Sequence, residues 1–473
     1  MHKTYLFYDL ETSGINKCFD QILQFAAIRC DENLNEIERY EFLVKLNPDT
    51  IPSPRATITH HISIEKASHG LSEYEAVKRI YALVNTPNTV SIGYNTLGFD
   101  DEFLRFSFFK NLFPPYDHQY KNGCRRMDLY PITAAYSLFA EDVLTWPENE
   151  AHKTSLKLEH LNCANHLYSG GRAHDAMTDV IVTLELARAF KRHHLQMWQY
   201  LAARFDKAED QKVLSQLDSG LTIDATDYKQ ALMISGKFGG EDQFMAPVLS
   251  LGQHWHYKNQ WCFLCLDLPE LQKATSASFK DCIWTVNKKW GDVPFLLPAK
   301  ARFLKKFNRS RLDVVRSNKA FLSENPAVFT AIRNEVLDYK HPEVENVDVD
   351  AALYQSKFMS DAEAALCARF HQADTEQKVA LVKEMPQSYA KRALRILGRL
   401  SPEHLPKKMQ GEFQGYLEQI ASYDEQSRPI DYKGEYKLSI MKACEEIQTL
   451  IGEGTLNDEQ IALLNELEAY LTR

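Results

Sequence analysis

The 473-residue sequence predicts an α/β protein with a mixed-sheet domain first, a β-containing domain next and an all-α C-terminal domain last. The first observation is that the N-terminal part gives three strands, a helix, a strand and a helix, without the strict alternation of a doubly wound sheet. The second is a set of short strand-like runs with four tryptophans between residues 234 and 298. The third is a series of helix-start signals after residue 360.

Composition indicates an ordinary globular protein. The formal net charge is -9, which argues against a protein that coats polyanions but leaves room for a local basic channel. Nine scattered cysteines, an odd number, favour a reducing compartment over a disulfide framework. The first strand begins too early to leave room for a signal peptide, and no apolar run approaches the roughly 18 residues of a membrane span. We therefore expect a cytoplasmic protein.

The opening strand, Tyr5–Leu10, carries the first candidate site. Asp9 and Glu11 are two residues apart at its end, so their side chains point to the same face. Two neighbouring carboxylates repel each other unless a cation joins them, and Mg²⁺ or Mn²⁺ is the usual cation. A solvated strand end, whose acids cap a turn or pair with surface bases, is the alternative.

The next elements complete an N-terminal mixed sheet. We expect strands at 22–30, 40–44 and 89–94 and a helix at 72–83. Asn95 ends the last strand, and the acids from Asp100 onward begin a helix that reaches about Lys110. This placement can bring Asp100 to the same cavity as Asp9, although acids in a first helical turn are also common complements of the helix dipole. No GxGxxG or Walker A sequence occurs, which argues against a nucleotide cofactor.

A glycine-containing loop precedes the last helix of this part. The glycines of the 169–179 segment place His174 in the loop, and we expect Asp179 to lie two turns into the helix that follows. A histidine before a helix is often a cap or a packed residue. Asp179 lies in an otherwise apolar helix, where a buried acid needs a partner.

These motifs, D-x-E-T-x-G, N-x-x-x-F-D and H-x-x-x-x-D in order, resemble the DnaQ-like DEDDh family of 3'-to-5' exonucleases. Further segments resemble the bacterial exonuclease I family, namely 93–102 (GYNTLGFDDE), 146–149 (WPEN), 155–161 (SLKLEHL), 235–239 (SGKFG) and 353–361. The resemblance implies an RNase H-like exonuclease domain at residues 1–193, an SH3-like middle domain at 194–345 and a helical C-terminal domain at 346–473.

The resemblance also implies a catalytic site. Asp9, Glu11, Asp100 and Asp179 are expected to bind two Mg²⁺ ions, with Mn²⁺ as the other candidate metal. One ion is expected to activate a water and the other to neutralise charge on the departing 3' oxygen. His174 is the expected general base. Glu11 and the backbone N–H groups of Thr12 and Ser13 are expected to contact the terminal nucleotide. Lys157 stands where the family has a phosphate-binding arginine, and a plain exposed lysine is the alternative.

The predicted function is the 3'-to-5' degradation of single-stranded DNA to 5'-mononucleotides in DNA repair and recombination. An RNA-trimming or proofreading exonuclease of the same family, or a catalytically silent scaffold that binds single-stranded DNA, is the alternative. The family implies two partners, single-stranded DNA and the acidic C-terminal tail of single-stranded DNA-binding protein. We expect a monomer.

Three features of the second half are also informative. Basic residues of the 300–311 segment alternate with Phe303 and Phe307. This pattern fits a surface that binds single-stranded nucleic acid, and it equally fits a solvent-exposed basic face whose aromatic residues belong to the core. Cys262 and Cys265 form a C-x-x-C in an apolar run, which favours buried thiols over a zinc site. After an acidic connector at 341–350, helices are expected to start at Ser360, Ser401 and Asn457.

Overall fold

The computed structural model describes residues 2–172 and 174–472. The chain forms two compact units, each built from segments that are distant in sequence. Unit 1 comprises Met1–Arg126, Gly170–Ile181 and Glu343–Arg473, and unit 2 comprises Met127–Ser169 and Val182–Pro342. The division into three consecutive domains, with boundaries after residues 193 and 345, stays a prediction.

A five-stranded mixed sheet has the strand order β3-β2-β1-β4-β5. The strands are β1 (Thr4–Thr12), β2 (Ile22–Cys30), β3 (Glu36–Leu43), β4 (Thr89–Gly93) and β5 (Arg125–Asp128). The strand β1 pairs antiparallel with β2 and parallel with β4, so the predicted antiparallel three-strand start and the fourth strand are confirmed. Because β1 extends to Thr12, Asp9 and Glu11 lie within the strand and not beyond it.

Four helices of unit 1 lie between these strands along the chain. They are α1 (Pro54–His60), α2 (Ile64–Ser68), α3 (Glu73–Val84) and α4 (Asp100–Lys110). The apolar faces of α3 and α4 pack against β1 in one core, which includes Leu6, Ile80 and Phe103. The predicted helices at 72–83 and from Asp100 are confirmed, whereas α1 and α2 were not predicted.

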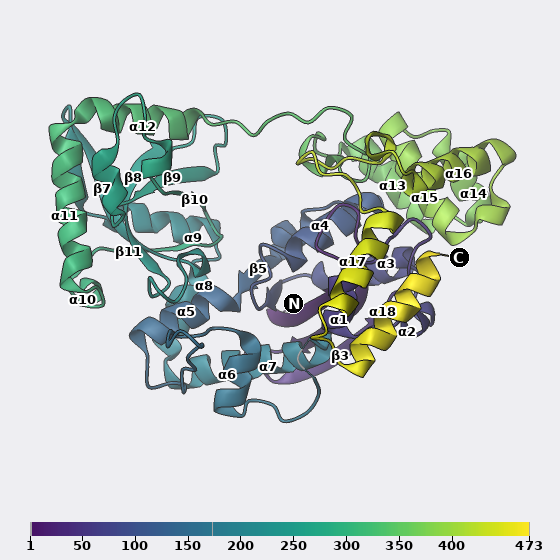
Figure 1. The fold of residues 1–473 in the computed structure, drawn as a ribbon, viewed down its shortest axis with the longest axis horizontal. Helices are drawn as coiled ribbons and strands as arrows, with labels where there is room; N and C mark the ends of the chain where they lie inside the picture. The colour runs from purple at the N-terminus through teal and green to yellow at the C-terminus, as the bar shows by residue number, and fades with distance from the viewer. Residues whose placement is uncertain (1, 173, 473) are drawn as a thin grey trace. The chain divides into compact units, whose positions relative to one another are not determined.

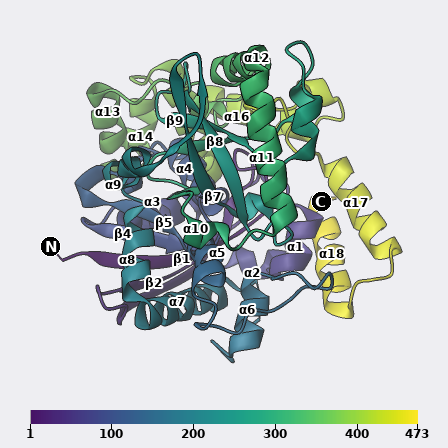
Figure 2. The ribbon, with the colours of Figure 1, turned by 90° about the vertical axis from the view of Figure 1, so that its left-hand side faces the viewer.

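Unit 2 contains a six-stranded sheet with the order β10-β9-β8-β7-β11, and β6 pairs with β7. The strands are β6 (Ser219–Ile223), β7 (Thr226–Ile234), β8 (Met245–Gln253), β9 (Gln260–Cys265), β10 (Thr285–Lys289) and β11 (Phe295–Pro298). Figure 2 shows α11 (Arg309–Glu324) lying along β7 and β8. Together with α12 (Pro326–Asp338), it covers one face of this sheet through Leu322 and Phe329.

The C-x-x-C segment lies within β9. Cys262 is buried in the core beneath α11 and α12, whereas Cys265 is buried in the core on the opposite face of the sheet. Residues three apart in a strand point to opposite faces, so the two thiols cannot bind one ion together. The strand geometry therefore supports the interpretation as buried thiols.

The remaining helices of the middle region precede or follow this sheet. They are α5 (Leu129–Phe139), α6 (Leu158–Asn165), α7 (Ala176–His193), α8 (Leu195–Ala203), α9 (Lys207–Gln211) and α10 (Ala301–Leu304). Short 3-10 turns lie at Asp117–Gln119, Lys121–Gly123, Lys212–Gln216, Gly236–Phe238, Pro269–Lys273, Lys280–Cys282, Ala352–Tyr354, Pro402–His404 and Glu425–Ser427. In the described part of the chain, no helix is both long enough and apolar enough to cross a membrane.

The C-terminal segment of unit 1 is helical, as predicted. Its helices are α13 (Asp361–Gln372), α14 (Thr375–Val382), α15 (Gln387–Leu400), α16 (Lys407–Ala421), α17 (Ile440–Gly452) and α18 (Asp458–Leu471). Capping boxes begin α13 at Ser360 and α18 at Asn457, which confirms two predicted starts. A helix also starts at Ser401 as predicted, but it is only the 3-10 turn Pro402–His404, and the Ser401 N–H bonds to the Leu397 carbonyl and ends α15.

These C-terminal helices pack directly on the N-terminal part of unit 1. Figure 1 shows α17 and α18 beside α1, and their common core joins Leu450 and Leu464 to Ile58 of α1. Tyr74 of α3 packs with the α13–α15 helices in a second core. The fold predicted from sequence, a mixed-sheet domain with β-containing and helical additions, is confirmed.

Candidate active site

Three acids converge near the C-terminal end of β1, the central strand of the five-stranded sheet. Asp9 and Glu11 come from one face of β1, and Asp179 comes from the first turn of α7. One carboxylate oxygen from each residue lies within 4.8 Å of the others, and all three side chains are partly buried. The predicted juxtaposition of the first and last motifs is therefore present in the structure.

Asp100 adds a fourth negative charge to this group. It is buried at the first position of α4, directly after the loop that follows β4. Burial raises the pKa of Asp9 well above its usual value, and the charges of Asp100 and then Glu11 raise it further. Burial, followed by the charges of Asp179 and Asp100, also raises the pKa of Glu11 to about 9.

Such a cluster is unfavourable as it stands, because the acids must either take up protons or share a cation. Closely spaced, partly buried carboxylate oxygens are the ligands that hard divalent cations such as Mg²⁺ and Mn²⁺ prefer. The donor set at Asp9, Glu11 and Asp179 therefore fits a divalent metal.

The residue next to Asp100 has a different role. Asp101 is buried and receives hydrogen bonds from Arg126 and His118, at 2.5 and 2.9 Å, and pairs with Arg105. Burial alone would raise the pKa of Asp101, but the charges of Arg105 and Arg126 hold it below its usual value. Asp101 is thus neutralised by the protein itself, whereas the charge of Asp100 acts on the acid cluster.

The loop before α7 holds His174 outside the helix, as predicted. His174 is exposed and has a φ of 60°, in the left-handed region. The predicted depth of Asp179 is wrong, because α7 starts only at Ala176 and Asp179 lies in its first turn. Asp175 sets this start, since its carboxylate accepts hydrogen bonds from the N–H and hydroxyl groups of Thr178 at 3.2 and 3.1 Å.

Asp175 is a site residue that the sequence interpretation missed. Its charge contributes to the raised pKa values of both Asp9 and Glu11, so it belongs to the same electrostatic cluster. An aspartate three residues before a threonine at a helix start is a capping pattern, and this pattern was the available signal.

Some polar groups of the turn after β1 form hydrogen bonds within the protein. The Ser13 N–H donates to the Gln21 carbonyl at 2.9 Å, and its contact with a nucleotide stays a prediction. Thr12 is buried, and its hydroxyl donates to the Gly14 carbonyl at 2.8 Å. The substrate contacts of Glu11 and Thr12 stay predictions.

Lys157 belongs to unit 2, where it precedes α6. Its side chain is 68% exposed, and its ammonium lies 3.8 Å from a carboxylate oxygen of Glu159. The phosphate contact of Lys157 stays a prediction.

The basic 300–311 segment is largely engaged within unit 2. Lys300 pairs with Asp218, Lys306 with Glu141 and Arg311 with Asp267. Phe307 is buried with the Arg311 guanidinium over its ring, and Phe303 packs edge-on against Phe139. These contacts make both aromatic rings part of the packing of unit 2, which favours the second of the two interpretations.

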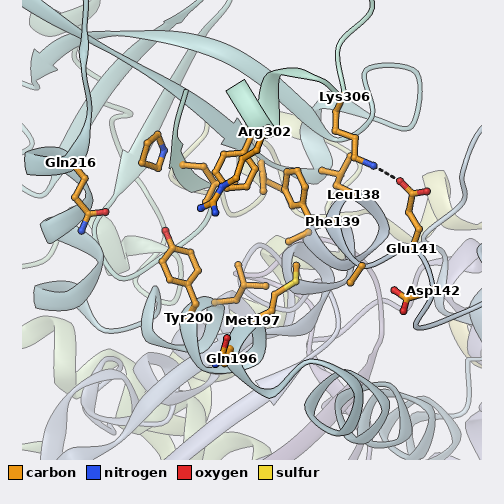
Figure 3. A pocket seen from close by; sticks show the side chains of 17 residues that line it. Leu138, Phe139, Glu141, Asp142, Gln196, Met197, Tyr200, Gln216, Arg302 and Lys306 are labelled. Atoms are coloured by element: carbon orange, nitrogen blue, oxygen red, sulfur yellow. Dashed lines mark hydrogen bonds and ion pairs between the residues drawn. The ribbon is translucent and has the colours of Figure 1, made fainter. Parts of the chain in front are cut away.

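A cavity of about 870 Å³ lies beside this segment, within unit 2. Figure 3 shows Leu138 and Phe139 of α5, Met197 and Tyr200 of α8, and Arg302 of α10 around it. The predicted catalytic residues are not among those that line it.

The acid cluster on a mixed sheet agrees with comparison to known proteins. Residues 6–187 match the RNase_T family model, which describes an exonuclease. Fold and site thus define the class of this protein, which is an exonuclease and therefore a hydrolase.

In particular, the whole chain is similar to exodeoxyribonuclease I. It is 29% identical over 493 aligned residues to Exodeoxyribonuclease I of Escherichia coli (strain K12), covering 99% of this chain and 97% of that protein. It is also 29% identical over 391 residues to Exodeoxyribonuclease I of Haemophilus influenzae, covering 76% of this chain and 78% of the relative. The crystal structure of E. coli Exonuclease I in complex with a dA16 oligonucleotide matches with a TM-score of 0.83 and 25% identity, covering 100% of this chain and 99% of that one.

Proposed function

We propose that this protein is a 3'-to-5' exodeoxyribonuclease that degrades single-stranded DNA to 5'-mononucleotides and acts in DNA repair and recombination. The observation that carries the proposal is the acid cluster, in which Asp9, Glu11 and Asp179 lie within 4.8 Å and Asp100 adds its charge. The full-length likeness to E. coli Exonuclease I, which has been solved with a dA16 oligonucleotide, supports single-stranded DNA as the substrate class.

The proposed cofactor is a pair of Mg²⁺ ions, with Mn²⁺ as a substitute. Asp9, Glu11 and Asp179 would bind the metal, and Asp100 would complete the negative environment. A zinc-bound form of the E. coli enzyme with single-stranded DNA supports a metal site in this fold. When bound, the ions supply Lewis-acid chemistry, since they favour deprotonation of water and neutralise charge on the phosphodiester.

The proposed role of His174 is that of general base. In the neutral form of an imidazole one ring nitrogen is free to accept a proton from the attacking water. The loop keeps His174 exposed to solvent while Asp179 holds its place in the first turn of α7. Glu11 and Thr12 would contact the terminal nucleotide, and Lys157 would contact a phosphate.

We also propose two partners and a setting for this activity. Single-stranded DNA is the substrate, and the acidic C-terminal tail of single-stranded DNA-binding protein is the second partner. We expect a monomer that acts in the cytoplasm.

The first test uses a 5'-labelled single-stranded DNA oligomer, so that successive shortening from the 3' end appears as a ladder. Wild-type protein with Mg²⁺ should give the ladder, and EDTA should stop it. Asp9→Asn and Asp179→Asn should abolish the reaction, and His174→Ala should reduce its rate by roughly 10²-fold, as loss of a general base usually does.

Circular dichroism serves as the control that each variant stays folded. An RNA oligomer of the same sequence separates the proposal from an RNA-trimming exonuclease. Shortening that persists in Asp9→Asn or in EDTA would contradict the proposed chemistry, and a faster reaction on RNA would contradict the proposed substrate.

A further inference from the structure

The loop that carries His174 is tied to the C-terminal helix α18 by a two-pronged ion pair. Arg172 donates from Nη1 and Nη2 to the two carboxylate oxygens of Glu459, and both distances are 3.0 Å. Arg172 lies two residues before His174, and Glu459 is the second residue of α18. A planar guanidinium and a carboxylate joined by two parallel bonds define orientation as well as distance.

Glu459 is held in place from its other side. The helix α18 begins with the Asn457–Gln460 capping box, and the Gln460 side chain donates to the Ile58 carbonyl of α1 at 3.3 Å. The same Glu459 oxygen lies 3.3 Å from Nδ1 of His61, at the end of α1. Glu459 is therefore anchored by two elements that do not include the loop.

Two described residues of this loop, Gly171 and His174, have left-handed backbones, which such support stabilises. His174 has a φ of 60°, which is unfavourable for a residue with a side chain and persists where surrounding contacts impose it. Gly171 has a φ of 76°, and a Cβ there would lie 1.9 Å from the Thr178 hydroxyl, so the loop approaches α7 closely. Asp175 fixes the C-terminal end of the loop through its bonds to Thr178. The Arg172–Glu459 pair fixes the other end.

We propose that Glu459 is a positioning residue, which acts through Arg172 to hold the loop so that His174 is presented to the reacting phosphodiester. This inference rests on the proposed function of His174 as general base. It assigns to the C-terminal helix a part in the activity of the N-terminal exonuclease domain.

The pair is expected to affect the rate far more than the stability. The Arg172 and Glu459 side chains are 53% and 51% exposed, and an ion pair so exposed contributes little to folding. A small displacement of a catalytic group, by contrast, lowers the rate strongly, because proton transfer requires hydrogen-bond distance.

The test measures kcat and KM for mononucleotide release from single-stranded DNA with Mg²⁺ in the full-length protein. Glu459→Gln should lower kcat roughly tenfold with KM and the melting temperature nearly unchanged, and Arg172→Gln should do the same. Combining either change with His174→Ala should add nothing to the loss caused by His174→Ala alone, because both act through the same group. The charge exchange Arg172→Glu with Glu459→Arg should recover part of the lost rate.

The matched control is Glu446→Gln. Glu446 of α17 accepts a hydrogen bond from Arg55 of α1 at 2.9 Å. This ion pair also joins α1 to a C-terminal helix, but neither of its residues belongs to the His174 loop. Glu446→Gln should leave kcat unchanged. Equal losses in Glu446→Gln and Glu459→Gln, or a further loss when Glu459→Gln is added to His174→Ala, would overturn the inference.

The two proposals fail in different ways. If His174→Ala has no effect on the rate, the assignment of the general base fails, and the positioning role falls with it. If His174→Ala lowers the rate while Glu459→Gln does not, only the positioning role is wrong.

Discussion

At the scale of single residues, neighbours in sequence have opposite electrostatic settings. Asp100 and Asp101 are consecutive and both buried, yet Asp101 is surrounded by Arg105, Arg126 and His118, while the charge of Asp100 raises the pKa of Asp9. Consecutive side chains at a helix start point about 100° apart, so they reach different partners. Asp101 is therefore neutralised by its neighbours, whereas the charge of Asp100 acts on the proposed metal site.

His60 offers a prediction at the same scale. It is buried at the end of α1, and its Nδ1 accepts a hydrogen bond from the Ile62 N–H at 2.9 Å. Burial lowers its pKa to about 3, with help from the charges of His61 and Lys66. In the unfolded chain the His60 imidazole takes up a proton near pH 6.5, whereas in the folded chain it stays neutral until the pH nears about 3. The contribution of neutral His60 to the free energy of unfolding is therefore complete above pH 6.5 and declines as the pH falls toward 3.

We expect the free energy of unfolding to fall by about 1 kcal/mol per pH unit below pH 6 through this residue. The comparison is with His60→Asn, whose side-chain oxygen can still accept from Ile62 but does not titrate. Urea unfolding at pH 7.5 and pH 5 measures both proteins, and the difference between them should shrink by about 1–2 kcal/mol at the lower pH. A difference that is the same at both pH values would contradict the assignment.

At the scale of elements, α15 attaches the C-terminal helices to the exonuclease domain through buried charges. Arg399 donates to both oxygens of Asp49, which lies after β3, at 3.0 and 2.6 Å. It also donates to Asp350 at 3.0 Å, and Tyr416 of α16 donates to Asp49 at 3.2 Å. Burial would raise the pKa of Asp350, but the charges of Arg395 and Arg399 lower it to about 2.

Arg399→Met should lower the free energy of unfolding by about 3–5 kcal/mol, because it leaves buried carboxylates without their counter-charge. Arg369→Met on α13 is the matched control, since the ion pair of Arg369 with Glu384 is 60% and 52% exposed and should contribute at most about 1 kcal/mol. Urea unfolding monitored by circular dichroism measures both. Equal effects of the two substitutions would show that the Asp49–Arg399 pair does not join the elements as inferred.

At the scale of the whole molecule, sequence order and spatial order differ. Unit 1 contains both ends of the chain, and the Pro342–Glu343 bond is one of the places where the chain passes between units. Residues 339–346 form no helix or strand. The C-terminal segment nevertheless packs on the N-terminal segment, for example through the Arg392 hydrogen bond to the Phe109 carbonyl at 2.6 Å.

A protease site inserted after Pro342 should therefore give two fragments that stay together. We expect the cut protein to elute from a size-exclusion column at the volume of the uncut protein, because buried contacts such as Tyr74–His371 hold the two fragments. In 8 M urea the fragments should separate. Separate elution under native conditions would show that the C-terminal segment depends on the intact connector.

Much of the fold and site follows from local sequence patterns. The alternation of β1 places Asp9 and Glu11 on one face, glycines keep His174 out of α7, and the Ser360 and Asn457 boxes begin helices as predicted. These features depend on residues within a few positions of one another, so the chain encodes them locally. The predicted start at Ser401 gives only a short 3-10 helix, Pro402–His404, and the same residue ends α15.

Only the tertiary structure decided which distant residues meet. The capping pattern of Asp175 indicates a helix start but not its place in the acid cluster, and no sequence pattern indicates that Asp49 pairs with Arg399 or that Arg172 reaches Glu459. The sequence by itself determined the chemical groups and their local direction, because dihedral preferences and caps act over short range. The fold decided the electrostatic partners, because the free energy of a buried charge depends on whichever charges packing brings beside it.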